Sequence, residues 1–297
     1  MRVFGTPRAE LGGPCPPKVL PSLFLILGWA AVAPPGASGQ WLEAPGRGWV
    51  DVAVYHQDTR EAYDSRGTVR PFSGDGHAVS TSTFLTVAGG IAPGLDAWIQ
   101  LPYHRLEYDD AVDDRLRSGI GDTRFYLRTA PLRYLGTDFP FAVRAGLKEP
   151  VGDFRVDAET IPLGDGQRDW EVMAEAGHSF HPSSGYLSGW VGYRWRELNG
   201  ETGRDFGDEI FFLVQGGASS GPWSFQVVAE GLETVTDPSV LGLVVESLER
   251  RLLTLAPSLG LSIGPGTASL GARFTLGGRN LPAGHALTAG YFTRWGF

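Results

Sequence analysis

The sequence predicts an all-β protein, an antiparallel transmembrane β-barrel of the bacterial outer-membrane type with about twelve strands, ten to fourteen being possible. Three observations support this. Residues 287–297 alternate between apolar and small or polar side chains and end at Phe297, an apolar segment near the N-terminus resembles an export signal, and the links between alternating segments alternate in length. A soluble β-sandwich or propeller is the alternative, because short strands bounded by turn residues also fit those folds.

The first 39 residues have the form of a signal peptide. Three basic residues precede an apolar run over 20–33, and small residues at 37–39 provide a cleavage site before Gln40. A permanent membrane helix needs roughly 17 to 25 apolar residues, so this run is short for an anchor. We therefore expect a signal peptide over 1–39 and a barrel over 40–297. The one cysteine, Cys15, precedes the apolar run, so the mature chain has no disulfide framework.

The composition narrows the class further. The net charge is −8, and removal of residues 1–39 changes it to −10, which argues against nucleic acid as a partner. The chain has 42 Gly, 9 Trp and 16 Phe, yet after residue 39 it has no apolar run as long as a membrane helix. Strands, rather than helices, are thus expected to cross the bilayer.

Twelve segments alternate in polarity and are bounded by turn residues. Each is about 10 to 14 residues long, which is enough to cross a bilayer at a tilt. Five short links alternate with five longer ones, as expected for periplasmic turns and external loops, and only the final link is brief. In order, the predicted strands are 48–57, 78–90, 96–107, 119–130, 139–149, 169–179, 186–197, 207–217, 222–233, 251–263, 267–277 and 284–297.

The third strand contains Pro102, which has no N–H to donate to a neighbouring strand. A closed barrel has no free edge for such a residue, so Pro102 predicts either a lateral gap in the wall or a bulge that only adjusts curvature. The acidic run at 107–114 follows this strand. It could bind a divalent cation, but its spacing matches no defined calcium motif, and a solvated loop is the simpler interpretation.

Inward-facing charges follow from the apolar parity of the later strands. Phe125 and Leu127 face lipid in the fourth strand, and Trp170 and Trp195 do so in the sixth and seventh, so the other parity faces the lumen. Charges on the lipid face would cost about 2 to 4 kcal/mol each near the midplane. The pore-lining candidates are Arg124, Arg128, Arg144, Lys148, Glu171, Glu175, Arg194, Arg196, Glu230, Arg273 and Arg294.

These charges allow two readings. They could line a selective pore, or they could form a salt-bridged network that closes a narrow barrel, since twelve strands lie between filled eight-stranded barrels and open sixteen-stranded porins. The mature chain has 21 Arg and a single Lys, Lys148. Arginine suits the bidentate carboxylate contacts that both readings require.

The sequence does not favour an enzyme. His178 and Ser179 are adjacent, so in a strand they point to opposite faces. Asp75-Gly76-His77, with Asp109 and Asp110, is faintly similar to the acidic and Asp-His pairs of omptin proteases, but the intervening glycine fits a turn. We predict no catalytic residue, no cofactor and no metal site.

Four short glycine-rich motifs carry a family resemblance: Gly119-Ile120-Gly121-Asp122, the segment 146–153 (GLKEPVGD), the segment 166–169 (GQRD), and Gly192-Tyr193-Arg194. They resemble the outer-membrane family named for the MetA pathway of phenol degradation, which is related to FadL-type transporters. The resemblance implies passage of small hydrophobic or aromatic molecules, with Pro102 marking a side opening. FadL-type transporters carry an N-terminal hatch, whereas only residues 40–47 precede the first strand here.

The predicted function is therefore an outer-membrane channel or transporter for small, hydrophobic or aromatic molecules in a Gram-negative bacterium. The alternative is a non-transporting structural or adhesive barrel, and a barrel hydrolase is less favoured. The expected partners are outer-membrane lipid and lipopolysaccharide, small hydrophobic solutes, and the barrel-assembly machinery acting through the strand that ends at Phe297.

Overall fold

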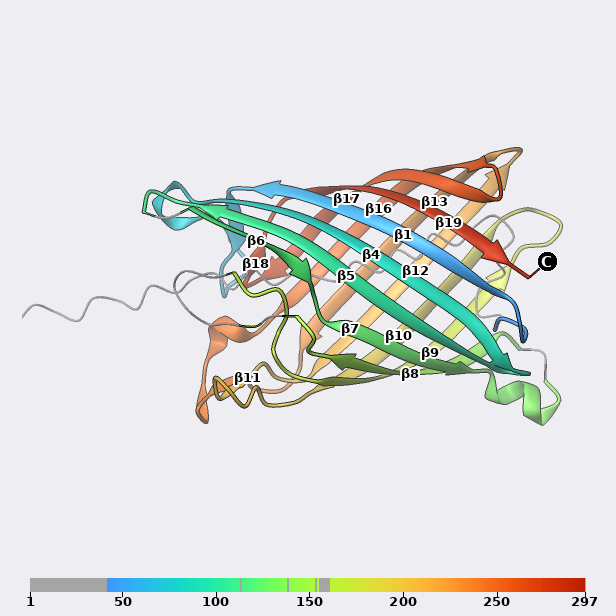
Figure 1. Ribbon diagram of the computed structural model, residues 1–297, viewed down its shortest axis with the longest axis horizontal. Helices are drawn as coiled ribbons and strands as arrows, with labels where there is room; N and C mark the ends of the chain where they lie inside the picture. Colours follow the sequence, from blue (N-terminus) through green and yellow to red (C-terminus); the bar gives the residue numbers. More distant parts are fainter. Residues whose placement is uncertain (1–41, 113, 138, 153, 155–160, 297) are drawn as a thin grey trace, which may run out of the picture.

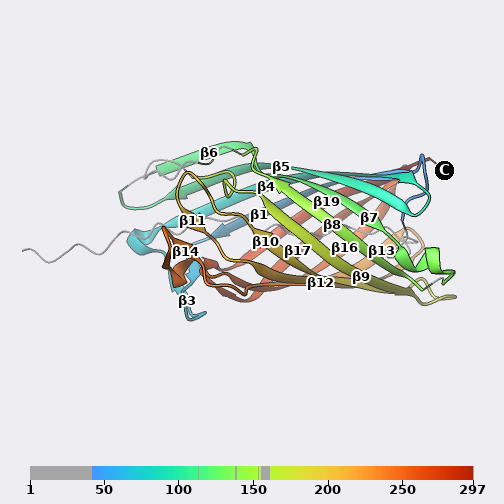
Figure 2. The same cartoon turned by 90° about the horizontal axis from the view of Figure 1, so that it is seen from below.

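The computed structural model describes residues 42–112, 114–137, 139–152, 154 and 161–296. These residues form an elongated barrel of tilted strands (Figure 1), and the view turned by 90° shows the same cylinder from below (Figure 2). The predicted signal peptide, 1–39, and the terminal Phe297 lie outside the described residues. Among the described residues, no helix is both long and apolar enough to cross a membrane.

A single antiparallel sheet closes on itself to make the barrel. The sheet contains thirteen strands, of which β6 and β7 are successive halves of one crossing, so the wall has the predicted twelve crossings; β1–β19 and β4–β5 pairing completes the ring. The strands are β1 (Gly48–Thr59), β4 (His77–Ala92), β5 (Leu95–Asp109), β6 (Asp114–Ile120), β7 (Thr123–Thr129), β8 (Phe141–Glu149), β9 (Asp169–Ser179), β10 (Tyr186–Arg196), β12 (Glu209–Ser220), β13 (Trp223–Thr234), β16 (Arg251–Ile263), β17 (Gly266–Arg279) and β19 (His285–Trp295).

Short elements occupy the links. Two three-stranded sheets lie beyond the wall, and the 3₁₀ helix η2 (Pro131–Leu135) joins β7 to β8. The links that carry the two small sheets gather at one end of the barrel, here called the long-loop end, and the C-terminus lies at the other, the short-turn end (Figure 1). The remaining elements are β2 (Glu61–Tyr63), β3 (Val69–Pro71), β11 (Arg204–Asp205), β14 (Ser239–Val240), β15 (Leu243–Val244), β18 (Leu281–Pro282), η1 (Ser73–Asp75) and η3 (Glu246–Leu248).

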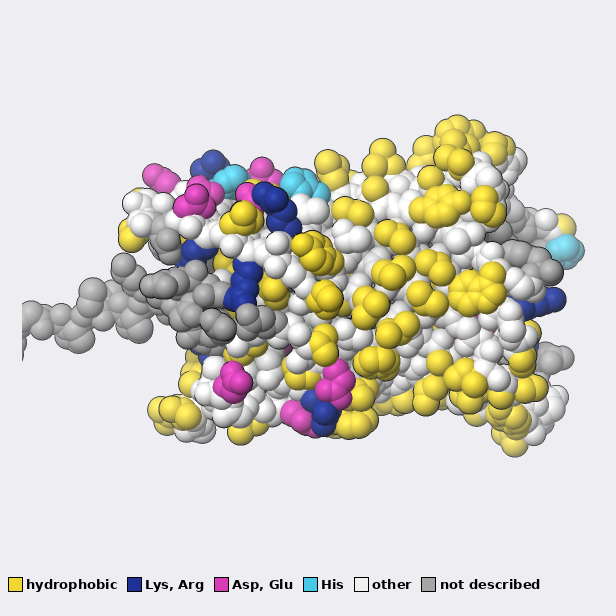
Figure 3. Space-filling model, in the orientation of Figure 1, with side chains coloured by type: hydrophobic (Ala, Val, Ile, Leu, Met, Phe, Trp, Pro, Cys, Tyr) yellow, Lys and Arg dark blue, Asp and Glu magenta, His cyan; other side chains and the backbone are white. Residues whose placement is uncertain are grey.

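The outer surface is apolar, as the parity argument predicted. Phe125, Leu127, Trp170, Val191 and Trp195 are all exposed on the barrel wall. Figure 3 shows hydrophobic side chains across the wall, with most charged side chains of this face towards the long-loop end. In the last strand Leu287, Tyr291 and Trp295 are exposed, while Phe292 is buried inside. This face suits contact with acyl chains.

Two boundaries differ from the sequence prediction. The predicted loop over 108–118 was too long, because β5 extends to Asp109, β6 begins at Asp114, and Asp109 pairs with Asp114 in the ladder. The predicted fourth strand, 119–130, is in fact broken at Gly121-Asp122 and starts earlier. Alternation alone missed the extension because Asp114–Ile120 projects with β5 beyond the regular wall, where neither face must be apolar.

Candidate functional site

The wall is interrupted where β6 gives way to β7. Strand β5 pairs with β7 up to Gln100 and with β6 from Tyr103, so Pro102 lies opposite the break. The Pro102 carbonyl accepts a hydrogen bond from the Gly121 N–H at 3.0 Å, and the β4–β5 register runs through Pro102 without a shift. Pro102 therefore leaves its own strand continuous, and the neighbouring crossing is the one that breaks.

Beyond this break, β6 pairs on one side only with the strands that the structure describes. Strand β8 ends at Glu149, opposite Thr123, so among the described strands β6 pairs with β5 alone. In Figure 2, β6 stands apart from the strands that follow it. The chain after β8 thus leaves the sheet near the long-loop end.

The segment from Ile161 to Gln167, here called the inner segment, packs within the mouth of the barrel. Ile161 and Leu163 are buried against Leu106 and Tyr108 of β5. A Cβ atom at Gly164 would overlap the Asp122 carboxylate, so only glycine allows this close approach. The Asp165 N–H donates a hydrogen bond of 2.9 Å to the same carboxylate.

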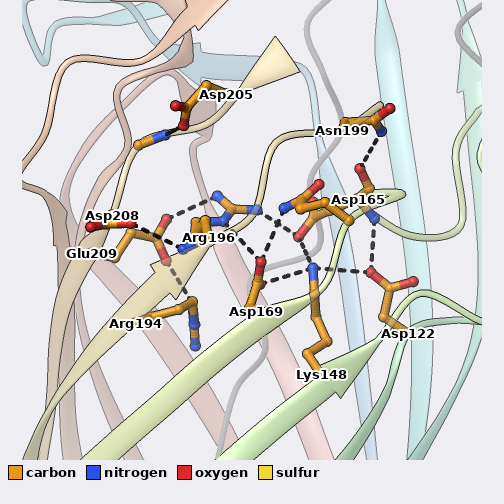
Figure 4. A network of polar contacts seen from close by, with 12 residues as sticks. Asp122, Lys148, Asp165, Asp169, Arg194, Arg196, Asn199, Asp205, Asp208 and Glu209 are labelled. Atoms are coloured by element: carbon orange, nitrogen blue, oxygen red, sulfur yellow. Dashed lines mark hydrogen bonds and ion pairs between the residues drawn. The ribbon is translucent and has the colours of Figure 1, made fainter. Parts of the chain in front are cut away.

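Among the described residues, ten charged groups form one connected ion-pair network around the inner segment, and Figure 4 shows the part of it that surrounds Asp165. Lys148 Nζ lies 2.8 Å from Asp165, 2.9 Å from Asp169 and 3.2 Å from Asp122. Arg196 also contacts Asp165, at 2.8 Å, and links it to Glu209 at 3.3 Å. The cations are Arg124, Lys148, Arg194, Arg196 and Arg250, and the anions are Asp122, Asp165, Asp169, Glu171 and Glu209. Five positive charges therefore balance five negative charges.

Nine of these ten groups belong to the wall or its immediate continuation, and Asp165 alone comes from the inner segment. Burial by itself would raise the pKa of the Asp165 carboxyl, but the ammonium of Lys148 and the guanidinium of Arg196 outweigh burial and hold that pKa well below its ordinary range. Asp165 is therefore ionised in the network.

A second cluster of ion pairs lies nearer the short-turn end, where the charged side chains also contact aromatic rings. Arg128 contacts Asp96 at 2.7 Å, and Arg144 contacts Glu175 at 2.5 Å. The Arg144 guanidinium lies 4.6 Å from the centre of the Trp98 ring. Such stacking stabilises a guanidinium held away from water. Farther round the wall, a pair between Arg273 and Glu230 spans 2.8 Å.

Two small cavities lie in the interior among the described residues. A cavity of about 70 Å³ lies beside the network, lined by Asp165, Arg194, Trp190, Phe211 and neighbouring side chains. A second cavity, of about 60 Å³, shares Arg273 with the first and is lined by hydroxyl groups such as those of Ser82 and Thr254. A cavity of about 150 Å³ can hold benzene, so an aromatic ring would need movement to enter either space.

The structure brings the eleven pore-lining candidates to the interior. Ten are buried, Arg294 is half-buried, and each belongs to at least one ion pair. Arg294 stands apart near the short-turn end, where it contacts Glu43 at 3.5 Å. This conformation matches the salt-bridged reading of the charges; their lining of a conducting pore stays a prediction.

Sequence reasoning missed several members of the networks. Asp169 and Glu209 begin their strands with inward parity, so the parity argument could have found them. Asp96 precedes Trp98 in the same way. Asp165 and Arg250 lie in links, where no periodicity assigns a face, and only the folded chain shows their partners.

Two histidine contacts bear on catalysis. His104 Nδ1 and Ser82 Oγ lie 3.1 Å apart on adjacent strands, and the His104 ring also packs edge-on against Phe84. The half-buried His77 lies between Asp58 at 2.6 Å and Asp109 at 3.1 Å. Among the described residues, no group of three or more His, Cys, Asp or Glu side chains is arranged to hold a metal ion.

Comparison with known proteins agrees with this architecture. The family model described as "Putative MetA-pathway of phenol degradation" matches residues 52–290.

The chain belongs to this family.

Solved structures similar to this member of the MetA-pathway family are bacterial barrels. An outer-membrane channel from Pseudomonas putida F1 superimposes with a TM-score of 0.68 at 14% identity, covering 88% of this chain and 99% of that chain. The translocator domain of the autotransporter NalP from Neisseria meningitidis gives 0.47, at 12% identity, with coverages of 86% and 91%. The toluene transporter TbuX from Ralstonia pickettii gives 0.43, at 10% identity, with coverages of 85% and 90%. No curated protein matches the sequence.

At this identity the first comparison shows a shared fold, that of an outer-membrane β-barrel. Within this member of the MetA-pathway family, the four glycine-rich motifs meet at the ten-membered network. Asp122, Lys148, Asp169 and Arg194 each come from a different motif. Three of these four residues contact the inner segment: Asp122 and Lys148 contact Asp165, and Asp169 contacts Gln167.

Proposed function

We propose that the protein is an outer-membrane channel or transporter for small hydrophobic or aromatic molecules, without catalytic activity. The observation that carries the proposal is the break between β6 and β7 opposite Pro102, near which Ile161 and Leu163 bury an apolar surface with Leu106. An apolar solute can lie along such a surface, whereas the ion-paired interior disfavours it. Membership of a family named for phenol degradation and the fold shared with the channel from P. putida F1 support the same function.

Uptake of radiolabelled toluene by intact Gram-negative cells tests this proposal, because their lipopolysaccharide leaflet slows unaided entry. Cells that display the protein should take up toluene several-fold faster than cells that display an unrelated closed barrel of the same strand number. Equal uptake, together with no single-channel current from the purified protein in planar bilayers, would defeat the proposal.

The route itself is tested at Pro102. Replacement of Pro102 by Ala restores an N–H opposite the Gly121 break, which should favour continuous pairing there and slow toluene uptake by about two- to tenfold. Pro257→Ala is the matched control, since Pro257 lies in β16 on another part of the wall and should leave uptake unchanged. Unaltered uptake in Pro102→Ala would remove the side opening from the proposal.

A non-transporting structural barrel is the second candidate. The observation that favours it is the ion pairing of all eleven pore-lining candidates, with two described cavities that are each too small for a ring. A barrel of this kind would give neither current nor toluene uptake, so the same two measurements separate the candidates.

A further inference from the structure

The carboxylate of Asp165 lies between two cations of the wall. Its Oδ2 atom accepts contacts of 2.8 Å from both Lys148 and Arg196, two cations that are buried almost completely. These cations come from β8 and β10, so the wall itself presents them. The carboxylate between them is brought by the inner segment.

Without Asp165, the network has one negative charge too few. Among the described members of the network, the wall contributes five cations but only four anions, Asp122, Asp169, Glu171 and Glu209. Withdrawal of the inner segment would leave one uncompensated positive charge away from water. A buried charge of this kind is strongly disfavoured unless an anion replaces the lost partner. An anion with a single negative charge would therefore restore the charge balance at the vacated position.

The surroundings of the vacated place suit an apolar body attached to that charge. The cavity of about 70 Å³ has Asp165 itself in its lining, together with Met173, Trp190, Phe211 and Leu232. Trp190 and Phe211 pack edge-to-face with ring centres 5.3 Å apart. A solute whose carboxylate replaced that of Asp165 would direct its ring towards these side chains.

We propose that the wall cluster of Lys148 and Arg196 is a binding site for small aromatic monocarboxylates, and that Asp165 is its internal occupant, displaced when such a solute binds. This inference rests on the proposed function, since it names a class of solute for the same barrel. The inner segment then acts as a tethered competitor. Binding of the solute frees it from its anchoring ion pairs, so the solute itself loosens the mouth of the barrel.

Calorimetry on the detergent-purified protein tests this, with benzoate as the probe and benzyl alcohol as its uncharged counterpart. Asp165→Asn keeps the shape of the side chain and removes the competing charge, and a tethered group competes at an effective concentration in the millimolar range, so benzoate should bind at least about tenfold more tightly than to the unaltered protein. Benzyl alcohol should show no such gain. Equal benzoate affinity in both proteins, or an equal gain for benzyl alcohol, would overturn the site.

Two variants control for charge. Glu201→Gln removes one negative charge from an exposed position in a long-loop-end link, outside the network, and should bind benzoate as the unaltered protein does. The double variant Asp165→Asn with Lys148→Met restores the balance of charges and should lose the tenfold gain. A gain in Glu201→Gln, or a gain retained in the double variant, would show that the effect is not local to this site.

A second measurement covers the case in which Asp165→Asn does not fold, which gel migration before and after heating would reveal. In the unaltered protein, saturating benzoate should raise hydrogen–deuterium exchange across the inner segment several-fold, and unchanged exchange would overturn displacement. Toluene uptake separates the two proposals. Uptake without benzoate binding defeats only the site, whereas benzoate binding without uptake or current defeats the proposed function and leaves the site standing.

Discussion

At the scale of single residues, Glu209 has the most contacts with cations in the network. It is fully buried and contacts Arg194 at 2.5 Å, Arg196 at 3.3 Å and Arg250. Arg194 and Arg196 belong to β10 and Arg250 lies in the link before β16, so Glu209, at the start of β12, joins these three parts of the chain. Loss of its charge would remove one carboxylate partner from each of these three guanidinium groups, in a site closed to water.

We therefore expect Glu209→Gln to lower the free energy of unfolding by roughly 3 to 5 kcal/mol. Urea unfolding in phospholipid vesicles, followed by tryptophan fluorescence, would measure it. The exposed Glu201→Gln should change stability by less than about 0.5 kcal/mol. Similar values for the two variants would mean that burial of Glu209 has little energetic weight.

The Asp165 ion pairs also predict a response to pH. The folded pKa of Asp165 lies below its ordinary value of 3.8, so its contribution to stability is present above that value and is lost only as the pH falls through the lowered pKa. Protection of the inner segment from hydrogen exchange, corrected for the intrinsic rate, should therefore be equal at pH 7 and pH 5. A loss of protection at pH 5 would contradict the assignment of Lys148 and Arg196 as dominant partners.

At the scale of elements, the strands divide the chain into a lipid face and an interior. Val191, near the middle of β10, is 54% exposed on the outer face. Its replacement by Arg should destabilise the barrel in vesicles by about 2 to 4 kcal/mol, because the charge would enter the hydrocarbon region. Val112→Arg, in the exposed turn between β5 and β6, should cost less than about 0.5 kcal/mol. Equal costs would show that β10 does not face lipid.

The same division explains how much of the structure could be predicted from sequence. Alternation with a period of two assigns each strand residue to a face, so the twelve crossings and the inward position of residues such as Arg124 and Glu171 could be found without coordinates. Alternation carries no information about register between distant strands. The partners of those charges, and the approach of His104 to Ser82, could not be found for that reason.

The inner segment was missed for a different physical reason. Links have no periodicity, and a link that folds back into a barrel is stabilised by contacts with many strands rather than by its own sequence. The surroundings of Asp165 are created by Asp122, Lys148 and Arg196, which come from distant parts of the chain. The break between β6 and β7 was not visible in its own segment, since Gly121-Asp122 continues the alternating pattern; only Pro102, on the neighbouring strand, predicted a gap or a bulge there.

At the scale of the whole molecule, the predicted signal peptide determines where the mature chain begins. We expect cleavage before Gln40, so mass spectrometry of the protein recovered from outer membranes should give a chain of residues 40–297. Substitution of the small residues at 37 and 39 by bulky ones should leave the longer precursor. Recovery of the full precursor from the unaltered sequence would refute the predicted signal peptide.

The chain has two lysines, Lys18 in the predicted signal peptide and Lys148 in the wall, where it is 1% exposed. An amine-reactive ester added to the folded mature barrel would thus find only the α-amino group accessible. The rate of acylation of Lys148 would therefore report how often this anchoring cation becomes exposed. Mass spectrometry of the peptide that contains residue 148 would measure that rate without any engineered label.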